Sequence, residues 1–452
     1  MKIILKNNII INKKEITKEL LNVIKNTFTI SNPKYEDAEK RGYYLGKINK
    51  YIFGFEEDED NLYLFRGRMG WLMARLCQYK VKYHVDDMRR AIDQIDAKFK
   101  GSLKPFQNDA VNNILEKDFG VLEAPCGSGK TIIAISTIVH RKQPTLIIVH
   151  TKELLKQWSD RIEQFLSMPA ENIGKIGNGI VDIKPITVGM VQTLNKRNLY
   201  EISKNFGFII IDECHHSPST TFSNVVTAFD SKYMLGLTAT PYRRDRLDKL
   251  ITWTLGNVVA TVTDADLQAA GKRIKPSIQI IETDFDYDYF DDSDYQPMIK
   301  ALCEDCKRNY LIIEHICNEA QKGSYQLVLS DRKSHLNQLW LELHRRDIES
   351  YVVTGSTLKK ERSDIISKAK AGEIKILLAT GQLLGEGFDA PIFNILHLTT
   401  PLKWFGRLKQ YIGRILRPCE GKAGATIYDY ADSKNGVLRA SFKKRQKYYE
   451  NS

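Results

Sequence analysis

Short apolar runs alternate with longer amphipathic stretches through most of this 452-residue chain. Phe208-Ile209-Ile210-Ile211 is apolar at every position, which is typical of a strand buried on both faces of a parallel sheet. The same pattern predicts strands at 120–123, 145–149, 186–188 and 233–237, and later at 326–329, 348–353, 374–379, 394–398 and 426–429. Because helix-length stretches separate these runs, the sequence predicts an α/β protein with two parallel-sheet lobes.

Residues 1–100 follow another pattern. A strand-like alternation at the start is followed by a predicted helix at 18–27, strand-like segments around 51–55 and 62–65, and an amphipathic helix at 71–78. We interpret 1–100 as a small α+β accessory domain, 101–260 as the first lobe, 261–300 as a connecting segment and 301–452 as the second lobe.

A glycine-rich segment, Ala-Pro-Cys-Gly-Ser-Gly-Lys-Thr, follows the strand at 120–123. Gly127, Ser128 and Gly129 allow backbone N–H groups to surround phosphate oxygens at the start of the next helix. Lys130 supplies a positive charge for the β- and γ-phosphates of ATP, and the Thr131 hydroxyl is a ligand for Mg²⁺. The general pattern has glycine where Ala124 stands. The alternative is a glycine-rich turn with a chance Lys-Thr.

Two acidic residues, Asp212 and Glu213, follow the apolar run at 208–211, at the strand end where open α/β sheets bind ligands. Asp212 is the candidate Mg²⁺ ligand, and Glu213 the base that deprotonates the attacking water. Alone, such a pair also fits a solvated turn. Cys214, His215 and His216 follow it, but no second ligand pair lies at zinc-like spacing nearby.

Asp212-Glu213-Cys214-His215 resembles the DExH box of superfamily 2 helicases and translocases. The other motifs of that superfamily follow in order over residues 100–430, and those of the second half resemble UvsW-like phage branch-migration helicases, including the T5-like phage helicase, and XPB-like DNA helicases. The motif segments are Phe106-Gln107, 149–154, 189–193, Leu237-Thr238-Ala239-Thr240-Pro241, 327–330, 380–389 and Gln410-Tyr411-Ile412-Gly413-Arg414-Ile415-Leu416-Arg417-Pro418. The resemblance implies two tandem RecA-like lobes with ATP bound between them.

The last of these motifs also has a reading from its spacing. Gln410, Arg414 and Arg417 lie at i, i+4 and i+7, on one face of a predicted helix. Two arginines on one face suit stabilisation of charge at the γ-phosphate. The alternative is a solvated basic helix face.

The resemblance assigns further roles. It implies nucleotide contacts for Gln107, Gly387, Asp389 and Gln410, and coupling of the ATP and nucleic-acid sites for Thr238 and Thr240. It implies nucleic-acid contacts for Thr151, Lys152, Gln192, Thr193, Thr380 and Gln382. In the accessory domain, aromatic and basic residues suit base stacking and phosphate contacts, with burial of the aromatics as the alternative: Tyr43, Tyr44, Lys47, Tyr51, Arg66 and Arg68.

These observations predict an ATP-dependent, Mg²⁺-requiring DNA helicase that unwinds or branch-migrates forked and branched DNA. We expect a monomer, with replication or recombination proteins as possible partners. Three alternatives remain: a DNA translocase subunit of a restriction or defence system, an RNA helicase, and a non-catalytic ATP-gated binding module. The intact motif residues argue against the last.

Composition narrows the picture only slightly. A formal charge of +12 is consistent with a polyanionic partner. The seven cysteines form no obvious disulfide framework, and no apolar run approaches a membrane span. We therefore expect the cytoplasm of a bacterial or phage-infected cell. We interpret Cys303, Cys306 and Cys317 as buried helix residues, and the acidic run at 284–294 as an exposed loop, with a DNA-repelling element as the alternative.

Overall fold

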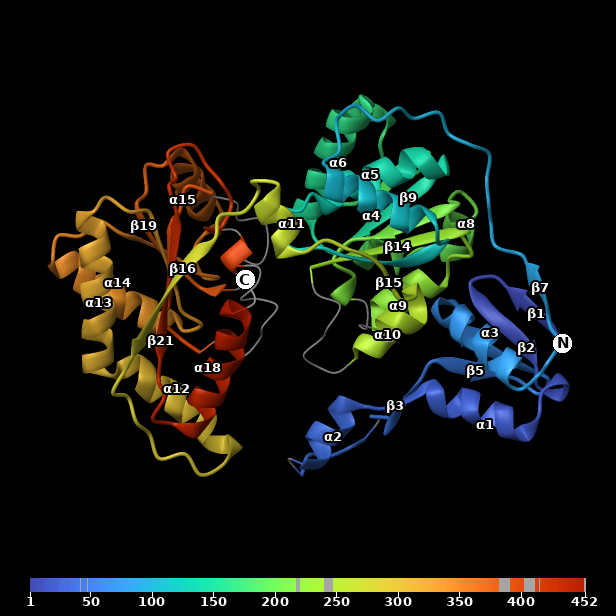
Figure 1. Cartoon of the computed structure of the whole chain (residues 1–452), viewed down its shortest axis with the longest axis horizontal. Helices are drawn as coiled ribbons and strands as arrows, with labels where there is room; N and C mark the ends of the chain where they lie inside the picture. Colours follow the sequence, from blue (N-terminus) through green and yellow to red (C-terminus); the bar gives the residue numbers. More distant parts are fainter. Residues whose placement is uncertain are drawn as a thin grey trace. The chain divides into compact units, whose positions relative to one another are not determined.

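The computed structural model describes residues 1–40, 42–46, 48–216, 220–239, 247–381, 391–401, 411–413 and 415–450. These residues form two compact units (Figure 1). One unit contains residues 1–124 and 129–262, and the other contains residues 125–128 and 263–452. Within the described residues, no helix combines the length and the apolar character needed to cross a membrane.

The first 87 residues fold around a five-stranded sheet with the order β5-β6-β2-β1-β7. Its strands are β1 (Lys2–Leu5), β2 (Asn8–Asn12), β5 (Phe55–Glu57), β6 (Asn61–Phe65) and β7 (His84–Asp87). Every second side chain of β2 and β6 is buried, in one apolar cluster with residues of α1 (Lys18–Thr27) and α3 (Met69–Gln78). The predicted strands and helices of this domain are therefore confirmed, and its alternating pattern reflects a sheet with one packed face.

A short hairpin extends this domain. Its strands are β3 (Thr29–Ser31) and β4 (Tyr51–Phe53), and α2 (Pro33–Lys40) lies between them in sequence. Tyr51 and Phe53 point to the same face of β4 because side chains alternate along a strand. Both side chains are exposed, 44% and 52% respectively, so the hairpin presents aromatic rings to solvent.

The first lobe contains an eight-stranded sheet with the order β11-β10-β12-β9-β13-β14-β8-β15. All neighbouring pairs are parallel except β10 with β11. The strands are β8 (Phe119–Glu123), β9 (Thr145–Val149), β10 (Gly174–Gly177), β11 (Ile180–Asp182), β12 (Ile186–Met190), β13 (Phe208–Ile211), β14 (Tyr233–Thr238) and β15 (Val258–Thr261).

Helices cover both faces of this sheet. Figure 1 shows α4 (Pro105–Leu115), α5 (Lys130–Arg141) and α6 (Lys152–Leu166) on one side, and α9 (Thr220–Thr227) and α10 (Asp248–Leu255) on the other. Every residue of β9 and β13 is consequently buried, which is why these strands read as continuous apolar runs. The carboxyl ends of the parallel strands meet at one edge, which gathers the residues following β8, β9, β12, β13 and β14.

The second unit contains a six-stranded parallel sheet with the order β16-β21-β20-β17-β19-β18. Its strands are β16 (Pro276–Glu282), β17 (Gln326–Leu329), β18 (Tyr351–Val353), β19 (Ile376–Ala379), β20 (Ile395–Leu398) and β21 (Ala425–Ala431). The helices with described bounds include α11 (Asp264–Ala269), α12 (Tyr295–Glu304), α13 (Cys306–Gln321), α14 (Lys333–Arg345), α15 (Lys359–Ala371) and α18 (Gly436–Tyr449).

The segment 261–300 differs from its expected role as a connection. Residues 276–282 form edge strand β16, which pairs with all seven residues of β21. Within the acidic run, Phe285 is buried in a cluster with Met298 and Leu302 of α12, and Asp284 forms an ion pair with Lys434 at 2.7 Å. Phe285, together with the partly buried Tyr287 and Tyr289, therefore attaches this segment to the second lobe, whereas Phe290 is exposed.

Candidate ATPase site

The glycine-rich segment connects β8 to α5, as the sequence predicts. Gly127 and Gly129 have φ values of +89° and +81°, a left-handed conformation that favours glycine. Gly129 caps α5, so Lys130 and Thr131 occupy the first turn of this helix, where free backbone N–H groups attract phosphate. The Lys130 ammonium donates to the backbone oxygen of Ala124 at 2.9 Å and so lies against the loop.

Gln107 lies beside this loop although it is distant in sequence from Gly129. Its side chain is buried, and its Oε1 accepts a hydrogen bond from the Lys104 backbone at the start of α4. A Cβ atom on Gly129 would lie 2.5 Å from Gln107 Nε2. The backbone conformation at Gly129 therefore favours glycine, and a larger residue there would also displace the Gln107 amide.

Asp212 follows β13 at the same edge of the sheet and is only 8% exposed. Its Oδ2 accepts a hydrogen bond from the indole Nε1 of Trp158 at 2.8 Å, and its Oδ1 accepts from the Glu213 backbone at 2.9 Å. Burial, and then the charge of Glu213, raise the pKa of Asp212 to about 6, against the opposing effect of the Trp158 hydrogen bond. Such a buried carboxylate gains more from a nearby cation than an exposed one does.

Glu213 connects this carboxylate to the next motif. Its φ of +48° is unusual for a residue other than glycine. The Nδ1 atom of His215 lies 3.2 Å from Glu213 Oε2 and 3.2 Å from Thr238 Oγ1, at the end of β14. The candidate base and the candidate coupling residue Thr238 therefore both contact one buried imidazole.

The donor set fits Mg²⁺. Asp212 and Thr131 offer a carboxylate and a hydroxyl, which are hard oxygen ligands, and Mg²⁺ is commonly bound by one or two carboxylates together with substrate phosphates. Among the described residues, no three His, Cys, Asp or Glu side chains are grouped so that they could hold a metal. Cys214 is buried, and a Cβ on Gly236 would lie 2.9 Å from its Sγ, so the thiol faces the core.

The prediction that three further cysteines are buried helix residues is correct only in part. Cys303 is buried on α12, whereas Cys317 is partly exposed on α13 and Cys306 is exposed at its start. A position at the first residue of a helix explains the exposure of Cys306, because its side chain lies outside the packed stripe of α13.

Four of the predicted nucleic-acid contacts lie in the first lobe. Thr151 caps α6, with its hydroxyl accepting from the Leu154 backbone, and Lys152 is exposed beside it. Gln192, at the start of α7 (Val191–Leu194), donates to the backbone oxygen of His150 at 3.0 Å, and Thr193 follows it. The loops after β9 and β12 are thus tied together. Thr380 lies after β19 in the second unit.

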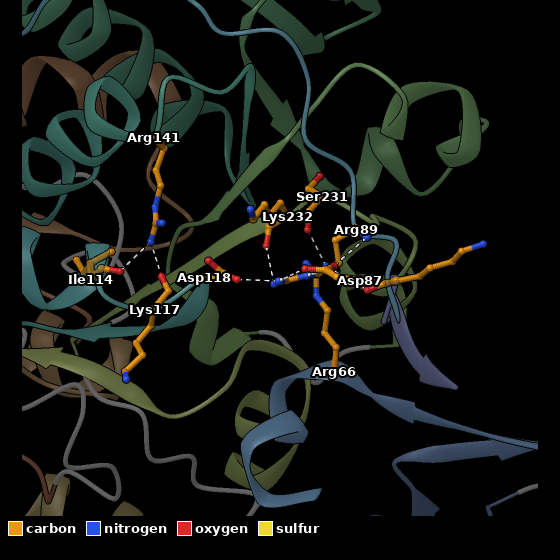
Figure 2. Close-up of polar contacts among 10 residues, drawn as sticks. Arg66, Asp87, Arg89, Ile114, Lys117, Asp118, Arg141, Ser231 and Lys232 are labelled. Atoms are coloured by element: carbon orange, nitrogen blue, oxygen red, sulfur yellow. Dashed lines mark hydrogen bonds and ion pairs between the residues drawn. The ribbon is translucent and has the colours of Figure 1, made fainter. Parts of the chain in front are cut away.

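The environment of Arg66 differs from the one that the sequence predicts. Its guanidinium is 2% exposed and donates to the Ser231 backbone oxygen at 2.7 Å, as Figure 2 shows. Desolvation by burial, and then the charge of Arg89, lower the pKa of Arg66 to about 9. The prediction that Arg66 contacts nucleic acid is therefore wrong, since the side chain is enclosed between the accessory domain and the first lobe. Arg68 is partly exposed and lies over the Trp71 ring.

A polar network surrounds Arg66 and holds the accessory domain on the first lobe. Arg89 bonds to Asp87, to Asp118 at 2.7 Å and to the Lys232 backbone oxygen (Figure 2). Arg90 forms two 2.9 Å bonds to Asp230. Side chains from the accessory sheet also share one apolar cluster with Leu250 and Trp253 of α10. The accessory domain is consequently fixed to the first lobe rather than tethered by a free linker.

Several predicted residues lie outside the described residues: Thr240, Gln382, Gly387, Asp389, Gln410 and Arg414. Arg417 is described and lies shortly after the helical residues 411–413 and 415. The ammonium of Lys422 donates to four backbone oxygens around this segment, those of Pro391, Phe393, Ile415 and Arg417. Burial lowers the pKa of Lys422 to about 8.

Two side chains with clear structural roles were missed by the sequence reasoning. Trp158 has the spacing of an ordinary core residue of α6, and only the fold brings its indole to Asp212. Lys422 lies between Gly421 and Gly424, where a solvated lysine is the normal expectation. Neither residue has a local sequence signal, because Trp158 bonds to Asp212 and Lys422 bonds partly to Pro391 and Phe393, all distant in the chain.

Two parallel-sheet lobes, a phosphate loop and a DExH centre define the class of protein. A family model described as "Type III restriction enzyme, res subunit" matches residues 100–243, and one described as "Helicase conserved C-terminal domain" matches residues 307–419. The chain belongs to the superfamily 2 helicases, with tandem RecA-like lobes. Membership implies nucleic-acid unwinding driven by ATP with a divalent metal.

Individual relatives support this assignment. A putative ATP-dependent RNA helicase of Acanthamoeba polyphaga mimivirus is 30% identical over 98% of this chain and 83% of its own length. A DNA 3'-5' translocase XPB2 of Sulfurisphaera tokodaii is 27% identical, over 76% of this chain and 86% of the relative. A probable helicase of Escherichia phage T5 is 25% identical, over 69% and 67%. The expected similarity to XPB-like and T5 phage helicases is confirmed.

A solved structure supports the fold alone. The helicase domain of Hef from Pyrococcus furiosus has a TM-score of 0.53 and 15% sequence identity, and the match covers 75% of this chain and 97% of that domain.

Proposed function

We propose that this chain is an ATP-dependent DNA helicase that unwinds or branch-migrates forked and branched DNA. The observation that carries the proposal is the set Lys130, Asp212 and Glu213 at one sheet edge, in a chain whose relatives include DNA helicases and translocases of the XPB type. The printed name of one relative specifies RNA, so RNA remains the second candidate substrate.

In this proposal each residue of the site has a separate role in binding or hydrolysing ATP. The loop at Gly127, Ser128 and Gly129 holds phosphates through backbone N–H groups, and Lys130 adds positive charge. Asp212 and Thr131 hold Mg²⁺, which supplies charge stabilisation for the transferring phosphoryl group. Glu213 removes a proton from the attacking water, and its orientation is set by the contact with His215.

The remaining predicted sites complete the proposal. Gln107, Gly387, Asp389 and Gln410 contact the nucleotide, and Arg414 and Arg417 stabilise developing charge on the phosphate. Thr238 and Thr240 couple hydrolysis to movement along a strand. That strand is held by Thr151, Lys152, Gln192, Thr193, Thr380 and Gln382 through its backbone, so recognition follows DNA structure rather than base sequence.

The accessory domain supplies a candidate surface for the fork. Large exposed apolar side chains include four aromatic residues within eleven positions of this domain: Tyr43, Tyr44, Tyr51 and Phe53. The Lys50 ammonium lies 5.9 Å from the Tyr51 ring centre, so aromatic and basic chemistry coincide here. Stacking of unpaired bases on such rings is sequence-tolerant, as a fork-processing enzyme requires.

ATP turnover should be measured without nucleic acid and with single-stranded DNA, duplex DNA, a fork, a four-way junction and matched RNA, while strand separation is followed in parallel. We expect the largest stimulation, with strand separation, on forked or four-way DNA. Stimulation by plain duplex without separation would instead indicate a translocase that acts with a partner. Stimulation by RNA alone would refute the DNA assignment. The matched control is Glu213→Gln, which should remain inactive on every substrate.

A further inference from the structure

The contact between Trp158 and Asp212 joins the candidate metal ligand to a helix that contains no catalytic residue. Trp158 belongs to α6, two helical turns after the cap Thr151, and is 1% exposed. Its indole has one N–H, which can only donate, and that group points to Asp212 Oδ2 at 2.8 Å. Because the indole is fully buried, its N–H needs an acceptor, and the Asp212 carboxylate supplies one.

The two hydrogen bonds of Asp212 together fix the plane of its carboxylate. One oxygen accepts from the indole of Trp158 and the other from the backbone of Glu213. Each carboxylate oxygen has two acceptor positions, so one on each oxygen is left for a metal ion or its water. A side chain held at both oxygens in a buried position loses little freedom when a cation binds.

We propose that Trp158 is a positioning residue of the Mg²⁺ site, whose indole N–H holds the Asp212 carboxylate in the orientation that accepts the metal. This inference rests on the proposed role of Asp212 as the metal-holding carboxylate. A side chain that hydrogen-bonds to a metal ligand, without contacting the metal, orients that ligand. Removing such a side chain typically reduces metal affinity or activity about 10- to 100-fold. Trp158 acts through Asp212 and does not touch the substrate.

The test compares ADP binding with and without Mg²⁺, measured by calorimetry on the full chain. The readout is the ratio of the two dissociation constants, which reports metal affinity at the nucleotide site without requiring hydrolysis or DNA. We expect Trp158→Phe to reduce this ratio by about tenfold or more while metal-free ADP binding is unchanged. Trp158→His, which restores an N–H donor, should recover part of the effect.

Two controls separate the possible failures. Trp253→Phe changes another buried tryptophan of the same unit, packed against Phe28, and should leave the ratio unchanged. Asp212→Asn should reduce the ratio strongly, and if it does not, the metal assignment of Asp212 itself fails. If Asp212→Asn reduces the ratio but Trp158→Phe retains the wild-type value, the positioning role is refuted. If Trp158→Phe does not fold, Trp158→Leu takes its place, because leucine also removes the N–H donor. A ratio reduced beyond any change in Trp253→Phe supports the positioning role, and a wild-type ratio refutes it.

Discussion

Replacing Gly129 by alanine should weaken nucleotide binding, and the structure gives two physical reasons. The first is backbone strain, since φ is +81° and an L-residue in the left-handed region costs about 1–2 kcal/mol. The second is a collision, since the new Cβ would lie 2.5 Å from Nε2 of the buried Gln107 side chain, so this amide, whose Oε1 accepts from the Lys104 backbone, must shift. Strain alone affects folding, whereas the collision displaces the loop that holds phosphate.

Gly179 provides a matched control for the strain. Its φ is +84°, and nothing lies within 4 Å of a Cβ built on it, at the turn between β10 and β11. We expect Gly129→Ala and Gly179→Ala to lower the free energy of unfolding by a similar amount, about 1–2 kcal/mol. Only Gly129→Ala should weaken ADP binding, by about tenfold or more, equivalent to roughly 1.4 kcal/mol.

The assay is calorimetric titration with ADP, together with thermal unfolding of each variant. A double-mutant cycle with Gln107→Ala isolates the collision, because removing the amide should recover part of the affinity lost in Gly129→Ala. If Gly129→Ala binds ADP as tightly as the wild type does, or if the two substitutions combine additively, the inferred collision with Gln107 is refuted.

Three further predictions concern the catalytic centre and the second unit. Glu213→Gln should abolish ATP turnover while ADP binding persists, because the substitution removes the base but no phosphate contact. Steady-state turnover and calorimetric ADP titration measure the two effects, and unchanged turnover would contradict the role of Glu213 as the base. Because the pKa of Asp212 is raised to about 6, the protonated form of its carboxyl increases as the pH falls through that value. The Mg²⁺-dependent affinity for ADP should therefore fall about tenfold per pH unit below about pH 6. An affinity that stays constant between about pH 7 and pH 5 would contradict this prediction. Arg445→Met should lower the free energy of unfolding of the second unit by about 3–5 kcal/mol in urea, because the fully buried Asp429 loses the guanidinium that donates two hydrogen bonds to it. The control is Arg345→Met at the exposed ion pair with Glu342, which should change this free energy by less than about 1 kcal/mol.

The central strands of both lobes were predictable because burial on two faces produces continuous apolar runs, whereas β10, β11 and β15 of the first lobe were not predicted. The runs at 145–149, 208–211 and 326–329 match β9, β13 and β17 residue for residue. The edge strand β16 was not predicted either, since none of its residues is buried and its apolar residues form no long continuous run. Its assignment to the second lobe depends on pairing with β21, which is more than a hundred residues away in sequence.

The accessory domain shows the same contrast for charged residues. Arg66 and Arg68 occur together between a strand and a helix, and the sequence gives both the same interpretation. In the structure Arg66 is buried and donates to the backbone oxygens of Lys6 and Ser231, while Arg68 remains partly exposed over an aromatic ring. Burial of a single arginine depends on which surface docks against it, and that information is not local.

By itself, the sequence determined the class of protein, the phosphate loop and the acidic pair, because backbone turns and strand ends need particular residues at particular spacings. Only the tertiary structure decided which distant groups act on that centre: Gln107 against Gly129, His215 between Glu213 and Thr238, and Trp158 on Asp212. The physical reason is that a motif records local backbone geometry. A hydrogen bond between residues far apart in the chain instead depends on how the helices pack on the sheet.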